Sequence, residues 1–316
     1  DKTSNSRDGI GCANRTPSNR IDDEMTLTPS LIGVSITGNR FRAWAYDAVG
    51  DVLHTCQSAN LRSGPVGPGA DQTLAVLDSW RRDFTGACPI LVSGARDSQQ
   101  GGLENHHPRV PFRLEDIGAS LHRDQDVLFI PSLVQTTPPD ITCGAETSLF
   151  GIDQPNGLVC IPDDLTLHFS LETGRVTGFT TELTRVIHGA ILARERAVST
   201  GLPEQVFSES VFVEWVERSL DTENAVSAYA VHAAVWTRQL APQHYECALS
   251  GLLIGADVAA HYDPGDDVIL IADDINLTRY GLALDALDAD VLEYSAEDCL
   301  TDGLWEIAEL AGLLAD

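Results

Sequence analysis

Residues 158–198 read LVCIPDDLTLHFSLETGRVTGFTTELTRVIHGAILARERAV. Three short apolar runs, at 158–162, 165–171 and 175–179, are separated by the turns D-D and E-T-G. This hairpin-like spacing predicts three antiparallel strands. The stretch 181–198 then places apolar residues at helical spacing, which predicts a helix. Three linked strands followed by a helix form the unit from which the rest of the fold is inferred.

The same order of elements is predicted in the first part of the chain. It comprises strands at 31–36, 40–47 and 51–57, a helix at 71–85, strands at 89–93 and 127–133, and a helix that could start at 146–152. The second part continues with helices at 205–219, 224–240 and 244–261, strand 268–272, helix 277–288, strand 289–294 and helix 302–314. Three antiparallel strands, a helix, a strand, a helix and a strand thus occur twice.

This repeated order is that of a duplicated ribonuclease-H-like α/β protein, the two-domain fold of actin, sugar kinases and chaperone ATPases, with a cleft between its domains. An unrelated pair of α/β domains is the alternative. We expect an N-terminal domain at 31–155 and a C-terminal domain at 156–316. Residues 1–30 are polar and without periodicity, which predicts a disordered tail. Because Met25 is the only methionine, the natural chain is expected to begin there, with the residues before it lying upstream.

The charge of the chain excludes several kinds of partner. The formal net charge is −27 and the isoelectric point is near 4.4, which argues against nucleic acid and anionic membranes. The most apolar stretch, 248–260, is short and contains Asp257, so it is predicted to be a buried helix. Seven scattered cysteines without a C-x-x-C pair indicate reduced thiols in a cytoplasmic protein. The expected partners are a small molecule and a possible second copy of the chain in a homodimer.

Lysine is almost absent from the chain. Lys2 is the only one, and it lies in the polar N-terminal stretch. The chain therefore has no lysine for a Schiff base or for a phosphate-binding loop. Any anion bound inside the fold must meet arginine, backbone N–H groups or a metal ion.

Several stretches resemble one known family. They are IGVSITGNRFRAWAYD (32–47), CGAETSLFG (143–151), LVCIPDDLTLHF (158–169), ALSGLLIGADVAA (248–260) and VILIADDINLTRYGLALDAL (268–287). Their order and spacing are similar, over roughly residues 31–316, to those of the 2-keto-3-deoxygalactonokinases, and the S-G-L-L-I-G-A-[ED] run is the most specific. Members of this family use ATP and magnesium to phosphorylate a 2-keto-3-deoxy sugar acid in D-galactonate breakdown. The resemblance therefore implies a sugar-acid kinase with a small-molecule substrate.

The departures from the family pattern lie in the phosphate loops. The family's first loop, D-W-G-[ST]-[ST]-N-x-R, is S-I-T-G-N-R-F-R here, with Ser35 at the aspartate position. Its P-G-T-H-x-K-W has become P-D-D-L-T-L-H (162–168), its A-G-T has become A-D-D (272–274), and its R-G-E-E-T has become C-G-A-E-T (143–147). Glycine lets a backbone approach phosphate, whereas aspartate adds a side chain and negative charge.

The resemblance nevertheless implies roles for the residues at these positions. Glu146 is the acid retained at a family motif and is the best catalytic candidate. The candidates for nucleotide or phosphate binding are Thr37, Gly38, Asn39, Asp273 and Asp274. The candidates for substrate binding are Arg42, Arg96 and Ser98. Magnesium, if used, is expected at Asp164 and Asp274, because carboxylates are good ligands for hard cations.

Structural explanations exist for the same acidic residues. Asp163 and Asp164 would form a solvated hairpin turn, and Asp273 and Asp274 would cap a helix N-terminus. Three functions therefore stay open. The first is an active kinase, and the second is a catalytically impaired pseudokinase that binds a sugar acid or a partner protein without a cofactor. The third is a metal-dependent hydrolase that uses the four aspartates.

Overall fold

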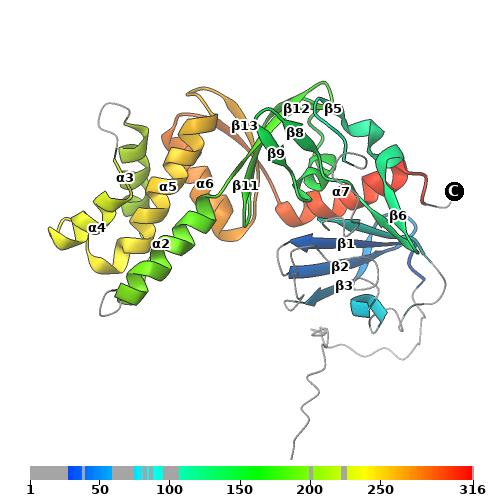
Figure 1. Cartoon of the computed structure of the whole chain (residues 1–316), viewed down its shortest axis with the longest axis horizontal. Helices are drawn as coiled ribbons and strands as arrows, with labels where there is room; N and C mark the ends of the chain where they lie inside the picture. The colour runs from blue at the N-terminus through cyan, green and yellow to red at the C-terminus, as the bar shows by residue number, and fades with distance from the viewer. Residues whose placement is uncertain are drawn as a thin grey trace, which may run out of the picture. The chain divides into compact units, whose positions relative to one another are not determined.

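The computed structural model describes residues 28–37, 40–58, 75–78, 80, 84, 88–94, 107–198, 202–221 and 226–314. Two compact units make up this part of the chain (Figure 1). Unit 1 contains the described residues up to Asp153 together with those from Cys299 onward, and unit 2 contains Gln154–Asp298. The boundary predicted from the sequence lies two residues later, and the whole C-terminal stretch was predicted to belong to the second domain. In the structure the last residues instead pack in unit 1.

Unit 1 is built on a sheet whose strand order is β3-β2-β1-β4-β7-β6. The first three strands are antiparallel, β4 and β7 run parallel to β1, and β6 is antiparallel to β7. The strands are β1 (Leu31–Thr37), β2 (Arg40–Tyr46), β3 (Val52–Ser58), β4 (Ile90–Ser93), β6 (His122–Asp124) and β7 (Val127–Phe129). Short strands β5 (Phe112–Arg113), β8 (Val134–Thr136) and β9 (Pro139–Ile141) and 3₁₀ helices η2 (Leu114–Ser120) and η3 (Ala145–Gly151) follow.

Unit 2 repeats the arrangement, with the strand order β14-β13-β10-β11-β12. Again three strands are antiparallel and two more run parallel to the first. The strands are β10 (Gly157–Pro162), β11 (Thr166–Glu172), β12 (Arg175–Glu182), β13 (Asp267–Ile271) and β14 (Asp290–Tyr294). The ribonuclease-H-like topology predicted from the sequence is therefore confirmed in both units.

Unit 2 contains the helices α2 (Thr184–Val198), α3 (Glu209–Leu220), α4 (Tyr229–Trp236), η4 (Pro242–His244), α5 (Tyr245–His261) and α6 (Asp274–Ala286). Helix α7 (Ala296–Leu310) lies mostly in unit 1. Helices α6 and α7 begin earlier than predicted, and the stretch predicted to start a helix near residue 146 forms the 3₁₀ helix η3. The helix predicted at 71–85 falls largely outside the described residues. No helix among the described residues is long and apolar enough to cross a membrane.

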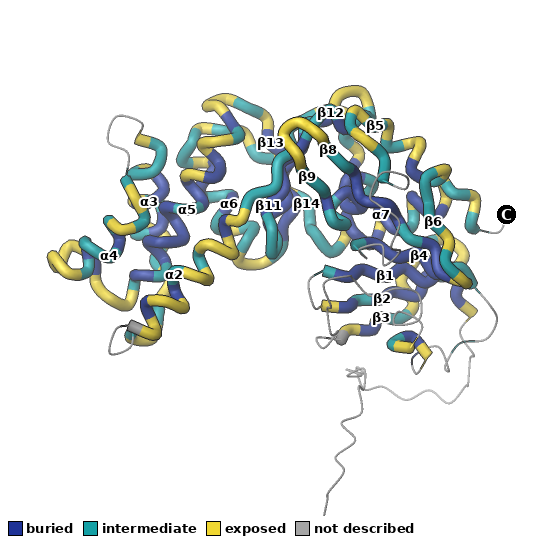
Figure 2. The backbone as a smooth tube through the Cα atoms, viewed as in Figure 1, coloured by how far each residue is buried: buried dark blue, intermediate teal, exposed yellow. Residues whose placement is uncertain are grey.

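The cores explain why the central strands are apolar. Strands β1, β4 and β13 are buried over nearly their whole length, as Figure 2 shows in dark blue. A strand covered on both faces reads as a continuous apolar run. In unit 1 the buried face of α7 packs beside β1 and β2 through Leu300, Leu304 and Ile307. This packing is the reason that the last residues belong to unit 1.

The thiols differ from the prediction at one position. Cys88, Cys143, Cys160, Cys247 and Cys299 form no disulfide. Cys56 is disulfide-bonded, so the prediction that all cysteines are reduced is wrong for this residue.

Two glycines in helix interiors give a matched pair of stability predictions. A Cβ on Gly303 of α7 would lie 2.1 Å from the carbonyl oxygen of Thr147 in η3, whereas a Cβ on Gly281 of α6 would meet its nearest atom at 3.6 Å. We expect Gly303→Ala to destabilise the protein by about 1–3 kcal/mol through overpacking. Gly281→Ala should stabilise it by about 0.5–1 kcal/mol, because alanine has the higher helix propensity. Urea unfolding of both variants tests the pair, and equal effects would contradict it.

Candidate active site

One candidate site lies in unit 1, where β1, β4 and η3 come together. Gly144 precedes η3 with φ +105°, and a Cβ there would lie 2.6 Å from the Cα of Gly94. Gly94 follows β4 with φ +78°, and a Cβ there would lie 2.2 Å from the carbonyl oxygen of Ile36 in β1. Only glycine fits these two positions. They bring the start of η3 against the carboxyl ends of two parallel strands, where open α/β sheets bind ligands.

Glu146 is the acidic group at this place, and it is fully buried. Its Oε2 accepts hydrogen bonds from the Thr142 hydroxyl and, at 3.0 Å, from the backbone N–H of Gly144. Its Oε1 is buried and has no hydrogen-bond partner within the described part of the chain. Burial raises the pKa of this carboxyl to about 7, against the lowering effect of Thr142 and the backbone donors. A buried carboxyl with a pKa near neutrality is typical of a general base.

Further hydroxyl groups lie on the segments that meet here. Ser93 Oγ lies 2.6 Å from Thr147 Oγ1 and donates to the carbonyl oxygen of Gly144 at 3.2 Å. Ser35 of β1 is buried as well. Among the described residues Glu146 forms no ion pair, and the groups that donate to its carboxylate, Thr142 and Gly144, are uncharged.

The raised pKa of Glu146 predicts a pH-dependent stability. A carboxyl whose folded-state pKa lies above its unfolded value favours folding below the unfolded pKa, and this contribution is lost as the pH rises through about 7. The full cost is about 3 kcal/mol, of which about 2 kcal/mol should develop between pH 5.5 and pH 8. Urea unfolding at both pH values tests this. The free energy of unfolding of the wild type should fall by this amount between pH 5.5 and pH 8, relative to that of Glu146→Gln. A constant difference between the two proteins would contradict the assignment.

A separate candidate site lies in unit 2, at the turn between β10 and β11. Pro162 and Thr166 are paired across the hairpin, and the N–H of Asp163 donates to the carbonyl oxygen of Leu165 at 3.1 Å. Asp164 lies 3.7 Å from Arg185 of α2, and both side chains are about half exposed (47% and 56%). The two aspartates therefore form the hairpin turn considered in the sequence analysis, and one of them already has a cationic neighbour.

The other aspartate pair lies where β13 leads into α6. Asp273 is the N-cap residue of α6, but its carboxylate accepts hydrogen bonds from the backbone N–H groups of Ala296 and Glu297 at 3.0 and 2.9 Å. It therefore caps α7 and not its own helix. Asp274 is exposed and has φ +51°. Asn276 Nδ2 donates to the Pro162 carbonyl oxygen at 2.9 Å, which ties the first turn of α6 to the β10–β11 hairpin.

Arg279 of α6 was not identified from the sequence. Its Nη1 donates to Ser250 Oγ at 3.2 Å, and its guanidinium lies 5.6 Å from the ring centroid of Phe207. Its Nε is buried and lacks a hydrogen-bond partner among the described residues. Burial lowers the pKa of this guanidinium. A half-buried arginine with an unused donor is a candidate for binding an anion. The sequence did contain a signal for this role. Arg279 lies on the helix that follows the A-D-D loop (272–274), and the only lysine that could replace it as a cation is Lys2.

The remaining predicted residues are placed only in part. Gly38, Asn39, Arg96 and Ser98 lie outside the described residues. Thr37 ends β1 and is half-buried. Arg42 lies on β2 with its guanidinium 5.3 Å from the ring centroid of Trp44. The roles predicted for these residues stay predictions.

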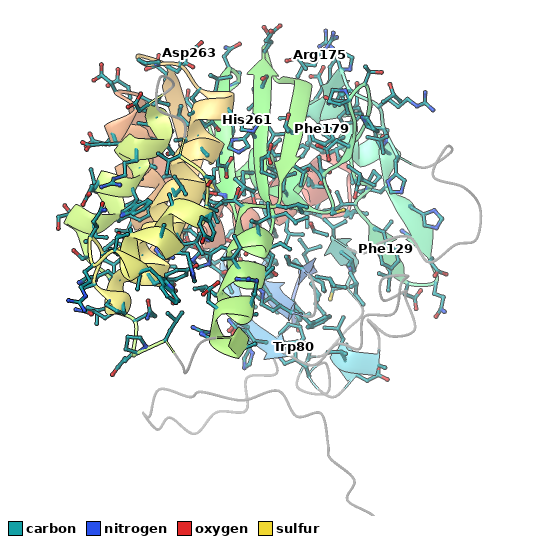
Figure 3. The ribbon with its side chains drawn as sticks, turned by 60° about the vertical axis from the view of Figure 1, so that its left-hand side comes forward. Trp80, Phe129, Arg175, Phe179, His261 and Asp263 are labelled. Carbon is teal, nitrogen blue, oxygen red and sulfur yellow. The ribbon has the colours of Figure 1, made fainter. Side chains whose placement is uncertain are left out.

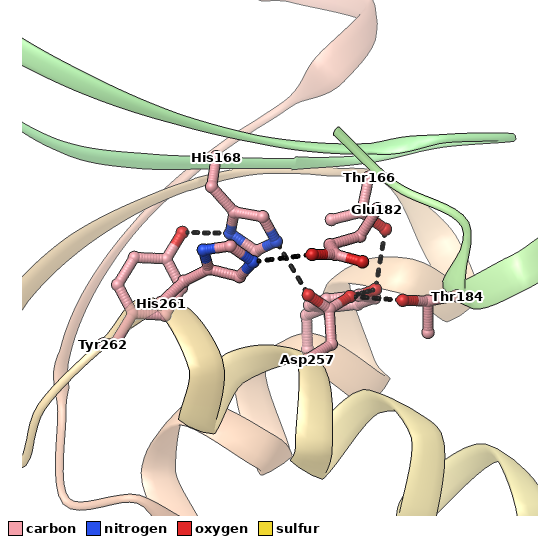
Figure 4. A network of polar contacts seen from close by, with 8 residues as sticks. Thr166, His168, Glu182, Thr184, Asp257, His261 and Tyr262 are labelled. Atoms are coloured by element: carbon pink, nitrogen blue, oxygen red, sulfur yellow. Dashed lines mark hydrogen bonds and ion pairs between the residues drawn. The ribbon is translucent and has the colours of Figure 1, made fainter. Parts of the chain in front are cut away.

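A buried polar network in unit 2 was also missed. The carboxylate of Asp257, on α5, accepts hydrogen bonds from His168, Thr184 and Tyr280 (Figure 4). His261, at the end of α5, lies against the sheet of the same unit (Figure 3) and stacks on His168 with ring centroids 3.9 Å apart. His168 Nδ1 is 2.7 Å from the Tyr262 hydroxyl. The signal in the sequence was an acid inside the apolar run 248–260, which is buried only when hydrogen-bonded.

Comparisons with known proteins identify relatives over most of the chain. A family model described as 2-keto-3-deoxy-galactonokinase matches residues 37–307. The structure of a proposed 2-dehydro-3-deoxygalactonokinase from Sinorhizobium meliloti is similar with a TM-score of 0.76 and 24% identity, covering 90% of this chain and 98% of that one. An activator of 2-hydroxyisocaproyl-CoA dehydratase from Clostridium difficile has a TM-score of 0.45 and 11% identity, with 89% and 96% covered. No curated protein sequence matches the chain.

Proposed function

Because the chain belongs to the 2-keto-3-deoxy-galactonokinase family, we propose that it transfers the terminal phosphoryl group of ATP to a hydroxyl group of 2-keto-3-deoxygalactonate. The observation that carries this proposal is the environment of Glu146. This residue is fully buried, its pKa is raised to about 7 by burial, and its Oε1 has no hydrogen-bond partner in the described part of the chain.

Glu146 would act as the general base. Its Oε2 is held by Thr142 and Gly144, so Oε1 is the oxygen left to accept a proton. In the proposed step the substrate hydroxyl gives its proton to Oε1, and its oxygen forms a bond to the γ-phosphorus of ATP. The bond from that phosphorus to the bridging oxygen of ADP breaks, and ADP leaves with the electron pair. A pKa near 7 lets the carboxylate accept the proton and release it later at neutral pH.

Magnesium would bind at Asp164 and Asp274. Asp274 is exposed and the Asp164 side chain is 47% exposed, and Asn276 ties the helix that Asp274 opens to the hairpin that carries Asp164. Oxygen ligands of this kind suit Mg²⁺, which keeps several of its waters. When bound, the ion would neutralise phosphate charge. The carboxylate of Asp273 fits this role poorly, because both of its oxygens already cap α7.

Arg279 is the proposed phosphate contact that takes over from the missing lysine. Replacing it with methionine should weaken Mg·ATP binding about 10-fold or more, because hydrogen bonds to charged groups each contribute about 1.5–3 kcal/mol. Arg218→Met is the matched control, since Arg218 also lies over an aromatic ring (Trp215, 4.6 Å) and, within the described residues, pairs with Glu214 on its own helix. Calorimetric titration measures both variants. Equal affinity of Arg279→Met and Arg218→Met would exclude this contact.

The pseudokinase is the second candidate, and the loops favour it. The hairpin turn presents two aspartates where the family has glycine and threonine, and Asp273 occupies the glycine position of the third loop. A carboxylate close to a phosphate without a cation between them is strongly unfavourable in a desolvated site. A protein of this kind would bind the sugar acid and transfer no phosphate.

Calorimetric titration of the full chain with ATP, with and without Mg²⁺, tests the proposed function, together with a coupled assay for ADP on 2-keto-3-deoxygalactonate. The kinase proposal requires Mg²⁺-dependent binding at micromolar ATP and ADP release that depends on the sugar acid. Binding of the sugar acid alone, with no ATP binding at millimolar concentration, would replace the kinase with the pseudokinase.

A further inference from the structure

We propose that Asp257 is a positioning residue that fixes three segments of unit 2, an inference that rests on the proposed function. They bear the proposed magnesium ligand Asp164, its neighbour Arg185 and the proposed phosphate contact Arg279. These segments are the β10–β11 hairpin, the first turn of α2 and the first half of α6. A single carboxylate on α5 would thereby set the geometry of Asp164, Arg185 and Arg279 together.

The contacts of Asp257 are short and come from three elements. Oδ1 accepts from His168 Nε2 at 2.8 Å, and Oδ2 accepts from the Thr184 and Tyr280 hydroxyls at 2.7 Å each. The Tyr280 hydroxyl is also 2.8 Å from Thr166 Oγ1, at the end of the hairpin. Asp257 itself is only 6% exposed. His168, Thr184 and Tyr280 therefore all bond to one acceptor that water does not reach freely.

Three residues of the network are close in sequence to Asp164, to Arg279 or to Arg185, the neighbour of Asp164. Thr184 precedes Arg185, Tyr280 follows Arg279, and Thr166, which contacts Tyr280, lies two residues after Asp164. A shift at any of these contacts moves the neighbouring residue with it, because side chain and backbone are covalently joined over one or two residues. Through this network the position of α5 would determine the positions of Asp164, Arg185 and Arg279.

The electrostatics fit a carboxylate that stays charged. Burial alone raises the pKa of Asp257, but the bonds from His168, Thr184 and Tyr280 outweigh it and hold the pKa below the usual value. The charged form accepts three hydrogen bonds at once, which a protonated acid does less well. The group therefore acts as a fixed acceptor at neutral pH and not as a proton carrier.

The same residues are poorly arranged to bind a metal. His168, Asp257 and His261 place ligand atoms within 4.8 Å of one another. However, the two imidazole rings are stacked at an interplanar angle of 16° with centroids 3.9 Å apart. A metal lies in the plane of each ring that binds it, at about 2.0–2.1 Å from nitrogen for zinc. Two stacked rings cannot both direct a lone pair at one ion, so a hydrogen-bonded network is the better description.

The test uses variants that remove single hydroxyl groups. Tyr280→Phe and Thr184→Val each delete one bond to Asp257, and Asp257→Asn changes all three. Tyr294→Phe is the matched control, because no hydrogen bond of the Tyr294 hydroxyl is found in the described part of the chain. Calorimetry with Mg·ATP and with 2-keto-3-deoxygalactonate gives two affinities for each protein. Amide hydrogen exchange of the ligand-free proteins measures how readily the backbone of each of the three segments opens.

We expect Tyr280→Phe and Thr184→Val to raise the Kd for Mg·ATP about fivefold or more, with the Kd for the sugar acid unchanged. Exchange should quicken in all three segments in each variant, and Tyr294→Phe should match the wild type. Loss of thermal stability with wild-type Mg·ATP affinity would overturn the inference and leave a purely structural network. Absence of ATP binding by the wild type would refute the proposed function. In that case hydrogen exchange would still test the role of Asp257. Faster exchange confined to the helix that carries the substitution would contradict the inference that Asp257 positions all three segments.

Discussion

Glu146→Gln is expected to lower kcat by about 10²- to 10⁴-fold, the range in which a general base contributes. Glutamine keeps the shape of the side chain and can still accept from Thr142 and Gly144, so the site should stay folded. It cannot take a proton from the substrate hydroxyl. The Kd for the sugar acid should change little, because Glu146 acts on a proton that is transferred only in the transition state. A coupled assay for ADP measures the loss.

The pH profile separates this role from a structural one. Because the pKa of Glu146 is raised to about 7 by burial, wild-type kcat should fall about tenfold per pH unit below that value. The residual activity of Glu146→Gln should lack this limb. Glu115→Gln is the control, since Glu115 is an exposed acid of unit 1 that pairs with Arg113 on the surface. Wild-type activity in Glu146→Gln would exclude Glu146 as the base.

Asp257→Ala is expected to lower the free energy of unfolding by about 3–5 kcal/mol, the loss associated with breaking a buried ion pair. The substitution leaves His168, Thr184 and Tyr280 as buried donors facing one empty acceptor position. Urea unfolding followed by circular dichroism gives the value. Asp285→Ala, an exposed aspartate on α6, should stay within about ±0.5 kcal/mol. Similar effects of the two substitutions would show that the Asp257 network contributes little to stability.

The fold was accessible from the sequence because its periodicity is strong and occurs twice. Runs such as 158–162 and 165–171 carry both the strand signal and the turn between them, so the topology followed from local patterns. Helix boundaries were less accessible. The start of α7 at Ala296 depends on Asp273, which lies 23 residues earlier and supplies the capping oxygens. A cap from a distant segment leaves no mark near the helix it stabilises.

The site was accessible only where a motif marks it. Glu146 was found because it stands in the run 143–147, but neither its complete burial nor its raised pKa follows from that run. Asp257 was interpreted as part of a buried helix, because its donors are 89, 73 and 23 residues away. Arg279 was missed for a similar reason, since its Ser250 partner lies on another helix. Side-chain networks between elements are set by packing and not by sequence spacing.

The left-handed backbone at Asp274 has a consequence for how this loop changes over generations. At φ +51°, glycine is accommodated without any adjustment of the chain, whereas most side chains are disfavoured. Aspartate and glycine codons differ by a single base. A single point mutation can therefore replace the aspartate at the start of α6 with uncharged glycine, and the backbone conformation does not oppose this change. Natural selection, and not backbone geometry, decides whether a carboxylate is kept at this position.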